Sequence, residues 1–144
     1  MKQITTIVAT LFFCCPLFGQ GIFSVHLDKM EALIKKSDFS LSKPLSFDKH
    51  NCILYVEDTQ IPLTNISSVR YTEANFEAFG DHQHRADIYC NGDPCIFYSQ
   101  LPVEHSRYDI LSFGFKTRHD AIELVNSIND FIDAVKAQGF CKKN

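Results

Sequence analysis

The sequence predicts an α+β domain in which a small antiparallel β-barrel or curved sheet packs against a C-terminal α-helix, with a further helix near the N-terminus. Three observations lead to this prediction: short apolar runs bounded by turn residues, alternation over 110–115 that puts Leu111, Phe113 and Phe115 on one face, and a one-sided apolar stripe over 121–135. Apolar residues make up 45% of the chain and charged residues 22%. This is the balance of a globular domain, which argues against disordered and low-complexity classes.

The first residues have the pattern of a secretory signal peptide. Lys2 supplies a positive charge, Thr5–Phe18 is an almost unbroken apolar run, and Gly19 is a small residue at its end. The run is shorter than the roughly 20 apolar residues that a membrane-spanning helix needs. We therefore expect residues 1–19 to be a signal peptide, and the mature protein to be secreted or periplasmic.

Removal of the leader would leave about 125 residues, which is the size of one domain. We divide them into an N-terminal helix and connector over 20–50, a sheet-and-helix domain over 51–138, and a tail over 139–144. The whole chain has 14 Lys and Arg against 17 Asp and Glu, for a formal net charge of -3. This balance argues against binding nucleic acid or anionic membranes through bulk charge.

The first half of the mature chain predicts one helix and then short strands. Apolar residues at helical spacing predict the helix within Ile22–Lys36, and a polar connector follows over 37–50. A strand is expected over Cys52–Val56, bounded by turn residues. Gln60–Leu63 and Ile66–Tyr71 are interpreted as one strand with an interruption between them.

Six cysteines are present, and two of them, Cys14 and Cys15, lie in the leader, where a lipid anchor is the alternative to cleavage. The other four allow three pairings, and an oxidising compartment makes two disulfides the expectation. A turn at Gly92-Asp93 would make a hairpin in which Cys90 faces Cys95, within disulfide range. We therefore favour Cys90–Cys95, which leaves Cys52–Cys141.

The C-terminal helix has the clearest signals. Thr117, with Asp120 three positions later, resembles a capping box, and Gly139 can end the helix. Between these positions one helical face is apolar and the other is polar, so we expect the helix to pack on the sheet. The apolar face consists of Ala121, Leu124, Val125, Ile128, Phe131, Ile132 and Val135.

Two segments carry a resemblance to known domains. Ile61–Tyr71 resembles the strand after the first turn in pleckstrin-homology-like and GRAM-like domains, and Phe113–Phe115 followed by helical Ala121–Leu124 resembles the way those domains end. The resemblance covers roughly 52–138 and implies a small barrel capped by a helix. Lipid-binding members carry Lys or Arg in their first turn, whereas Glu57–Gln60 is acidic here, so we expect no phosphoinositide binding.

One short segment contains candidate metal ligands. In an extended chain His82 and His84 project to the same side, and with Asp81 or His105 they could hold zinc, which takes imidazole nitrogen and carboxylate oxygen. The alternative is a solvated loop before the strand at Ile88. No complete metal motif is present, so we assign no metal or cofactor and keep these four residues as candidates.

The segment Thr72–Arg85 is the expected functional surface. It is a long connection between two strands, and long connections on a rigid scaffold often carry binding residues. Phe76 and Phe79 stand among polar residues there, as aromatic anchors of an interface do. The alternative is a short helical turn that buries both rings against the sheet.

Three functions remain open from sequence. No serine-hydrolase, zinc-protease, phosphate-loop or calcium-loop motif is present, so we do not expect an enzyme. The first hypothesis is a secreted or periplasmic binding module with a protein or peptide partner. The second is a carrier of a small ligand or lipid in a pocket between sheet and helix. The third is a metal-dependent enzyme that uses His82 and His84.

Overall fold

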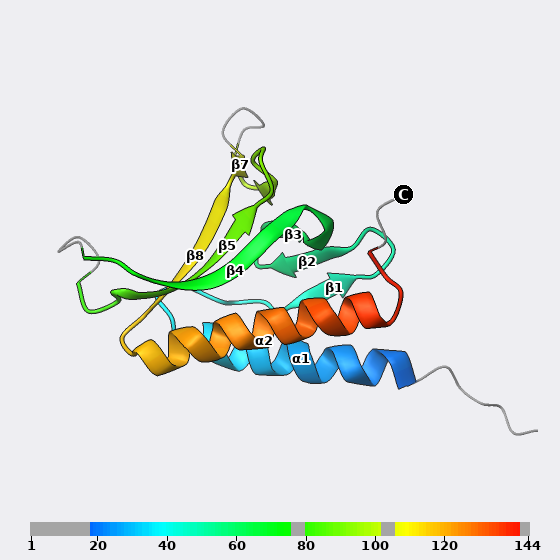
Figure 1. Ribbon diagram of the computed structural model, residues 1–144, viewed down its shortest axis with the longest axis horizontal. Helices are drawn as coiled ribbons and strands as arrows, with labels where there is room; N and C mark the ends of the chain where they lie inside the picture. Colours follow the sequence, from blue (N-terminus) through cyan, green and yellow to red (C-terminus); the bar gives the residue numbers. More distant parts are fainter. Residues whose placement is uncertain (1–17, 76–79, 102–105, 142–144) are drawn as a thin grey trace, which may run out of the picture.

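The computed structural model describes residues 18–75, 80–101 and 106–141. Two helices lie side by side and antiparallel in one layer, and two antiparallel sheets cover them (Figure 1). The sheets do not close into a barrel, so the curved-sheet version of the predicted α+β fold is the one the chain adopts. No helix in the described part of the chain has the length and apolarity needed to cross a membrane.

The larger sheet has five strands in the order β1-β2-β3-β6-β7. Its first three strands form a meander that is consecutive in sequence, and β6 and β7 join it later along the chain. The strands are β1 (Ser46–Asp48), β2 (Ile53–Val56), β3 (Thr59–Pro62), β6 (Ile96–Tyr98) and β7 (Arg107–Tyr108).

The smaller sheet consists of β4 (Ile66–Glu73), β5 (His84–Cys90) and β8 (Ile110–Phe115), with β5 in the centre. A 3-10 turn, η1 (Leu63–Asn65), carries the chain from β3 in one sheet to β4 in the other. The prediction that 60–63 and 66–71 form one interrupted strand is therefore wrong, because the two segments pair with different neighbours.

The connector over 37–50 also differs from expectation. It contains β1, which pairs with β2 and was not predicted because three residues carry no usable periodicity. The Glu57 carboxylate accepts hydrogen bonds from the backbone of Ser42 and Lys43 and from the Ser42 hydroxyl, which ties the connector to the β2–β3 turn. The backbone of Asp38 pairs with that of Gly114 at the free edge of β8.

Both ends of α2 (Arg118–Ala137) are closed by the residues that the sequence indicates. The Thr117 hydroxyl accepts a hydrogen bond from the backbone N–H of Asp120, which satisfies one of the free donors of the first turn. At the other end Gly139 has a φ of +78°, and the N–H groups of Gly139 and Phe140 bond back to Lys136 and Val135. This is a Schellman ending, for which glycine is favoured because it enters the left-handed region without strain.

The apolar stripe of α2 is buried at every predicted position, so this face is core. It packs against the smaller sheet and also against α1 (Phe18–Ile34), which the sequence did not identify as its partner. The Phe131 ring meets Phe23 of α1 and Phe47 of β1 edge to face, at 6.0 and 5.2 Å between centroids. Phe23 lies after the expected cleavage point, so every described core residue would remain in the mature chain.

Two disulfides are present, Cys52–Cys141 and Cys90–Cys95, which are the two pairs favoured from sequence. The hairpin used to argue for the second pair does not form, because β5 and β6 belong to different sheets. Cys90–Cys95 therefore links the two sheets where the chain passes between them. Cys52–Cys141 joins the start of β2 to the segment after α2, 89 residues later in sequence.

Candidate peptide-binding groove

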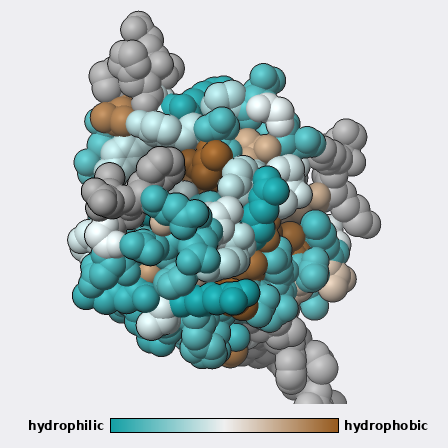
Figure 2. Space-filling model, turned by 60° about the vertical axis from the view of Figure 1, so that its left-hand side comes forward, coloured by the Kyte–Doolittle hydropathy of each residue, from teal (hydrophilic) through white to brown (hydrophobic). Residues whose placement is uncertain are grey.

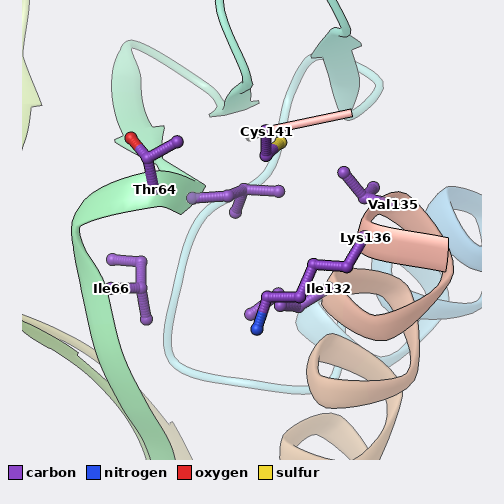
Figure 3. A pocket seen from close by; sticks show the side chains of 7 residues that line it. Thr64, Ile66, Ile132, Val135, Lys136 and Cys141 are labelled. Carbon is purple, nitrogen blue, oxygen red and sulfur yellow. The ribbon is translucent and has the colours of Figure 1, made fainter. Parts of the chain in front are cut away.

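A groove lies between the start of β4 and the last turns of α2. Its deeper part is a pocket of about 280 Å³, drawn in Figure 3, and a shallower part of about 90 Å³ continues it along β4. The two parts share Leu63, Ile66, Ile132 and Lys136, so they form one continuous depression. We call it the β4–α2 groove; its remaining lining residues are Thr64, Ser67, Ser68, Val69, Asn129, Asp133, Val135 and Cys141.

The strand side of the groove is a sheet edge. Among the described strands, β4 pairs only with β5. The Val69 carbonyl accepts a hydrogen bond from the Asn129 side chain of α2 at 3.4 Å, so the backbone of Val69 faces away from β5. Because residues of an antiparallel pair face the partner strand alternately, the backbone N–H and C=O groups of Tyr71 and Glu73 face away from β5 as well. The edge thus directs main-chain groups outward at every second residue, and of these the Val69 carbonyl is already bonded to Asn129.

Five of the seven residues that line the deep end of the groove are apolar, Thr64 and Lys136 add polar surface, and the pocket is partly open to solvent. Leu63 and Ile66 line it from the chain that leads into β4, and Ile132 and Val135 line it from α2. Cys141 lies at one end of the pocket (Figure 3). The Cys52–Cys141 disulfide holds this residue against the start of β2. The pocket is slightly smaller than the roughly 300–1,000 Å³ typical of sites for drug-sized ligands, and its size suits one apolar side chain.

Two charged side chains of α2 border the groove. Figure 3 shows the Lys136 side chain on the helix side, with its nitrogen directed into the space between α2 and the strand that carries Ile66. Among the described residues, none forms an ion pair or side-chain hydrogen bond with the Lys136 ammonium group. Asp133, one turn earlier, lines the shallower part beside Ser67 and Ser68. The groove therefore offers a cation that lines both of its parts and has no partner among the described residues, and an anion that lines only the shallower part.

Tyr71 forms a rigid polar cluster near the other end of β4. Its hydroxyl lies 2.9 Å from His84 Nδ1 and donates to Glu73 at 3.3 Å, and the Arg118 guanidinium lies 5.5 Å above its ring. Burial, reinforced by the nearby Glu73 carboxylate, raises the pKa of the Tyr71 hydroxyl above its ordinary value. The hydroxyl is therefore neutral at physiological pH, and the side chains of Glu73, His84 and Arg118 contact this residue.

The predicted metal candidates are not brought together. His84 hydrogen-bonds with Tyr71, whereas His82 pairs with the Asp81 carboxylate at 3.2 Å. Asp81 also pairs with Lys116 at 2.9 Å, and the hydrogen bond to Lys116 lowers the pKa of the Asp81 carboxyl. His105 lies outside the described residues. Within the described ranges, no three His, Cys, Asp or Glu side chains are arranged to hold a metal ion.

The predicted aromatic anchors, Phe76 and Phe79, also lie outside the described residues. The connection that contains them runs between the end of β4 at Glu73 and the start of β5 at His84, and the backbone of Ala74 still pairs with Gln83. The interpretation of this segment as a binding surface therefore stays a prediction. The β4–α2 groove lies at the opposite end of β4, beside Ile66.

A buried carboxylate lies on the face of the smaller sheet that points away from the helices. Asp87 of β5 is 5% exposed and accepts hydrogen bonds from the hydroxyls of Thr72, Ser112 and, at 3.2 Å, Tyr89. Burial and the neighbouring Asp87 charge raise the pKa of the Tyr89 hydroxyl. The three donors lie on three different strands, Thr72 on β4, Tyr89 on β5 and Ser112 on β8. The buried carboxylate therefore has its hydrogen-bond partners within the sheet, and these bonds fix the register of the three strands.

A second, apolar depression lies between the sheets. It has a volume of about 280 Å³, and three of its lining residues, Leu101, Tyr108 and Ile110, are exposed large apolar side chains. Its other walls are Phe39, Thr59, Ile96, Tyr98 and Leu111. On the face shown in Figure 2, hydrophilic side chains predominate and apolar ones occur in small separate groups.

Sequence reasoning missed both the β4–α2 groove and the Asp87 cluster. The groove joins residues 63–69 to 129–141, and nothing local in either segment indicates the other. No protein-family model matches this chain, and no match is found among curated proteins or solved structures. The resemblance to pleckstrin-homology-like domains accordingly stays a prediction, and function is argued from the geometry alone.

Proposed function

We propose that this protein is a secreted or periplasmic, non-enzymatic binding module that takes an extended segment of a partner protein along the free edge of β4. The observation that carries the proposal is that β4 pairs with one strand only among the described strands, and that its other edge borders a groove walled by a helix. Strand addition to such an edge gains main-chain hydrogen bonds, while pockets beside the edge select side chains.

The edge is suited to this role because it is rigid. The neighbouring strand β5 is the centre of the sheet, and the Asp87 cluster ties all three strands together on the far face. On the near face, Val69 and Ile88 are buried against α2. A preorganised edge loses little conformational freedom when a peptide adds to it, which favours affinity.

The compartment is inferred from two features. The apolar leader supports export, and two disulfides linking distant parts of the fold support an oxidising environment. Exposed sheet edges also promote uncontrolled pairing between chains. A groove walled by α2 restricts access to β4 to segments that fit, which supports a specific partner.

The test uses a proline at the edge. The Tyr71 N–H faces away from β5, so Tyr71→Pro removes a donor that strand addition needs without removing a hydrogen bond to β5. Tyr71→Val is the matched control, since it removes the same ring but keeps the N–H. The probe is a synthetic library of random peptides, with binders measured by fluorescence polarisation and their site located by amide chemical shifts.

Selected peptides should shift amide signals of β4 and α2, bind Tyr71→Val, and fail to bind Tyr71→Pro. Thermal melting of both variants verifies that the fold is kept. Peptides that bind Tyr71→Pro as well as the parent, or that shift only signals elsewhere, would show that β4 is not the binding edge.

A carrier of a small apolar ligand is the second candidate, favoured by the depression around Leu101, Tyr108 and Ile110. This depression lies between the two sheets, whereas the sequence-based hypothesis placed the ligand between sheet and helix, which is where the β4–α2 groove lies. Native mass spectrometry of protein purified from its host would detect a retained ligand, and Ile110→Asp should abolish retention. The metal-enzyme hypothesis has no geometric support among the described residues.

A further inference from the structure

We propose that the β4–α2 groove binds the free C-terminus of its partner, with the last side chain in the apolar pocket and the terminal carboxylate beside Lys136. This inference rests on the proposed function and names the part of the partner that is recognised. It follows from the apolar side chains at the pocket end of the groove, from the Lys136 cation, which has no partner among the described residues, and from the direction of β4.

The two ends of the groove differ in shape. Along β4 it is bordered by Ser67, Ser68 and Val69, and a strand that displaces the Asn129 side chain from the Val69 carbonyl could continue past Val69 toward Tyr71. Beside Ile66 it deepens into the apolar pocket and stops at Cys141, which the disulfide to Cys52 holds in place. A chain that follows the edge into the pocket must therefore end there or turn out into solvent.

The charge of Lys136, which lines both parts of the groove, decides which chain end fits. The Lys136 ammonium group is directed into the pocket mouth and has no carboxylate partner among the described residues (Figure 3). A terminal carboxylate placed there would gain a charge-assisted hydrogen bond, whereas a terminal ammonium group would meet a like charge. The cation thus selects the C-terminus of a partner over its N-terminus.

Strand direction agrees with this choice. β4 runs from Ile66, at the pocket, to Glu73, away from it. An antiparallel strand added to β4 runs the opposite way, so its C-terminal end arrives at the pocket. Antiparallel pairing is also slightly more stable per residue than parallel pairing. Geometry and charge therefore point to the same orientation.

The lining of the groove also sets a preference among sequences. The walls formed by Leu63, Ile66, Ile132 and Val135 favour an apolar last residue, because a polar side chain would lose its hydration without a partner. Asp133 lines the shallower part, so residues before the last one should be neutral or basic. The preferred ligand is an extended C-terminal tail, with few acidic residues, that ends in an aliphatic residue.

The experiment compares two synthetic libraries of random peptides of the length of β4. The libraries are identical except that one ends in a free carboxylate and the other in an amide. Binders from the first library are also resynthesised as amides and measured by fluorescence polarisation. We expect them to end in aliphatic residues and to bind about tenfold more weakly as amides, the effect of one charge-assisted hydrogen bond.

Three variants assign that loss to the cation. Lys136→Gln should weaken binding of the acids about tenfold and leave the amides unchanged, whereas Lys136→Arg should retain the preference for acids. Lys29→Gln is the matched control, because Lys29 is an exposed lysine on α1 away from the groove. It should change neither affinity.

The outcomes separate the two proposals. C-terminal recognition would be overturned if amidated peptides bind as tightly as peptides with a free carboxylate, or if Lys136→Gln does not change the affinity of the latter. If the same peptides still lose affinity for Tyr71→Pro, the proposal of strand addition is retained. If neither library yields a binder, strand addition fails and C-terminal recognition fails with it.

Discussion

The two faces of the three-stranded sheet are made by alternate residues of the same strands, yet they are stabilised in opposite ways. The face toward α2 carries apolar side chains such as Ile88 and Phe113, which are almost completely buried. The other face carries Asp87 surrounded by hydroxyl donors, with Arg85 Nε 3.9 Å from its carboxylate. Asp87 is nearly as buried as its apolar neighbours, so burial alone does not distinguish the two faces.

The comparison shows how a free edge can be kept rigid. Apolar packing on one face is non-directional and would tolerate some sliding of the strands. The hydrogen bonds from Thr72 and Ser112 to one carboxylate on the other face require β4, β5 and β8 to keep a single register. The groove depends on that register, because it places the backbone of Val69, Tyr71 and Glu73 outward.

The largest effect is expected from the apolar face. Phe113→Ala deletes a fully buried ring that packs 5.2 Å from Phe39, and it should lower the free energy of unfolding by about 3–5 kcal/mol. Chemical denaturation measures the change. A cost below about 1 kcal/mol would mean that this face collapses around the cavity and contributes little to the core.

A smaller but clear effect is expected from the polar face. Asp87→Ala leaves the Thr72, Ser112 and Tyr89 hydroxyls without their shared acceptor and should cost about 1.5–3 kcal/mol. It should also broaden amide signals along β4 if the cluster holds the register. Unchanged stability together with sharp β4 signals would show that apolar packing alone positions the edge.

Gly114→Ala tests the contact that covers the free edge of β8. A Cβ at this position would lie 2.5 Å from Asp38 Oδ2, so the Asp38 side chain must move and release its hydrogen bond to the Gly114 N–H. We expect a cost of about 1 kcal/mol. In an Asp38→Ala background the same substitution should cost almost nothing, and an undiminished cost there would place the strain elsewhere.

The N-terminal cap of α2 should contribute about as much as one ordinary capping residue. Thr117→Ala removes the acceptor for the Asp120 N–H and should lower stability by about 1 kcal/mol. Thr117→Ser keeps the hydroxyl and is the control. Equal melting temperatures for all three proteins would indicate that packing of α2 hides the cap.

The smallest effect concerns pH. Hydrogen bonds from Lys36 and then Thr117 lower the pKa of the Asp120 carboxyl from 3.8 in the folded state. The folded carboxylate binds its proton less readily than the unfolded one, so its stabilisation is present above about pH 4 and is lost as the pH falls through the folded pKa. In Lys36→Gln the melting temperature should therefore decrease slightly less between about pH 5 and pH 2 than it does in the parent protein. A steeper acid loss in Lys36→Gln would contradict the assignment.

Local signals in the sequence determined the elements whose hydrogen bonds are local. Thr117 and Gly139 mark the ends of α2 because a helix bonds residue to residue within one turn and its ends must be capped nearby. The stripe from Ala121 to Val135 determined which face is buried, because a period of 3.6 residues is visible in sequence. The strand over 110–115 was visible in the same way, through its period of two.

Only the tertiary structure decided how the strands are shared between two sheets, and with them the site. Cys90 and Cys95 are five residues apart and form a disulfide, as the sequence suggested. The disulfide nevertheless joins two sheets, because β5 pairs with β4 and β8 whereas β6 pairs with β3 and β7. Which strands pair with one another depends on packing between segments that are far apart in sequence. The hydrophobic period within a strand shows which face is buried but does not identify the neighbouring strand. The free edge of β4, the pocket beside Ile66 and the cation of Lys136 exist as one groove for that reason.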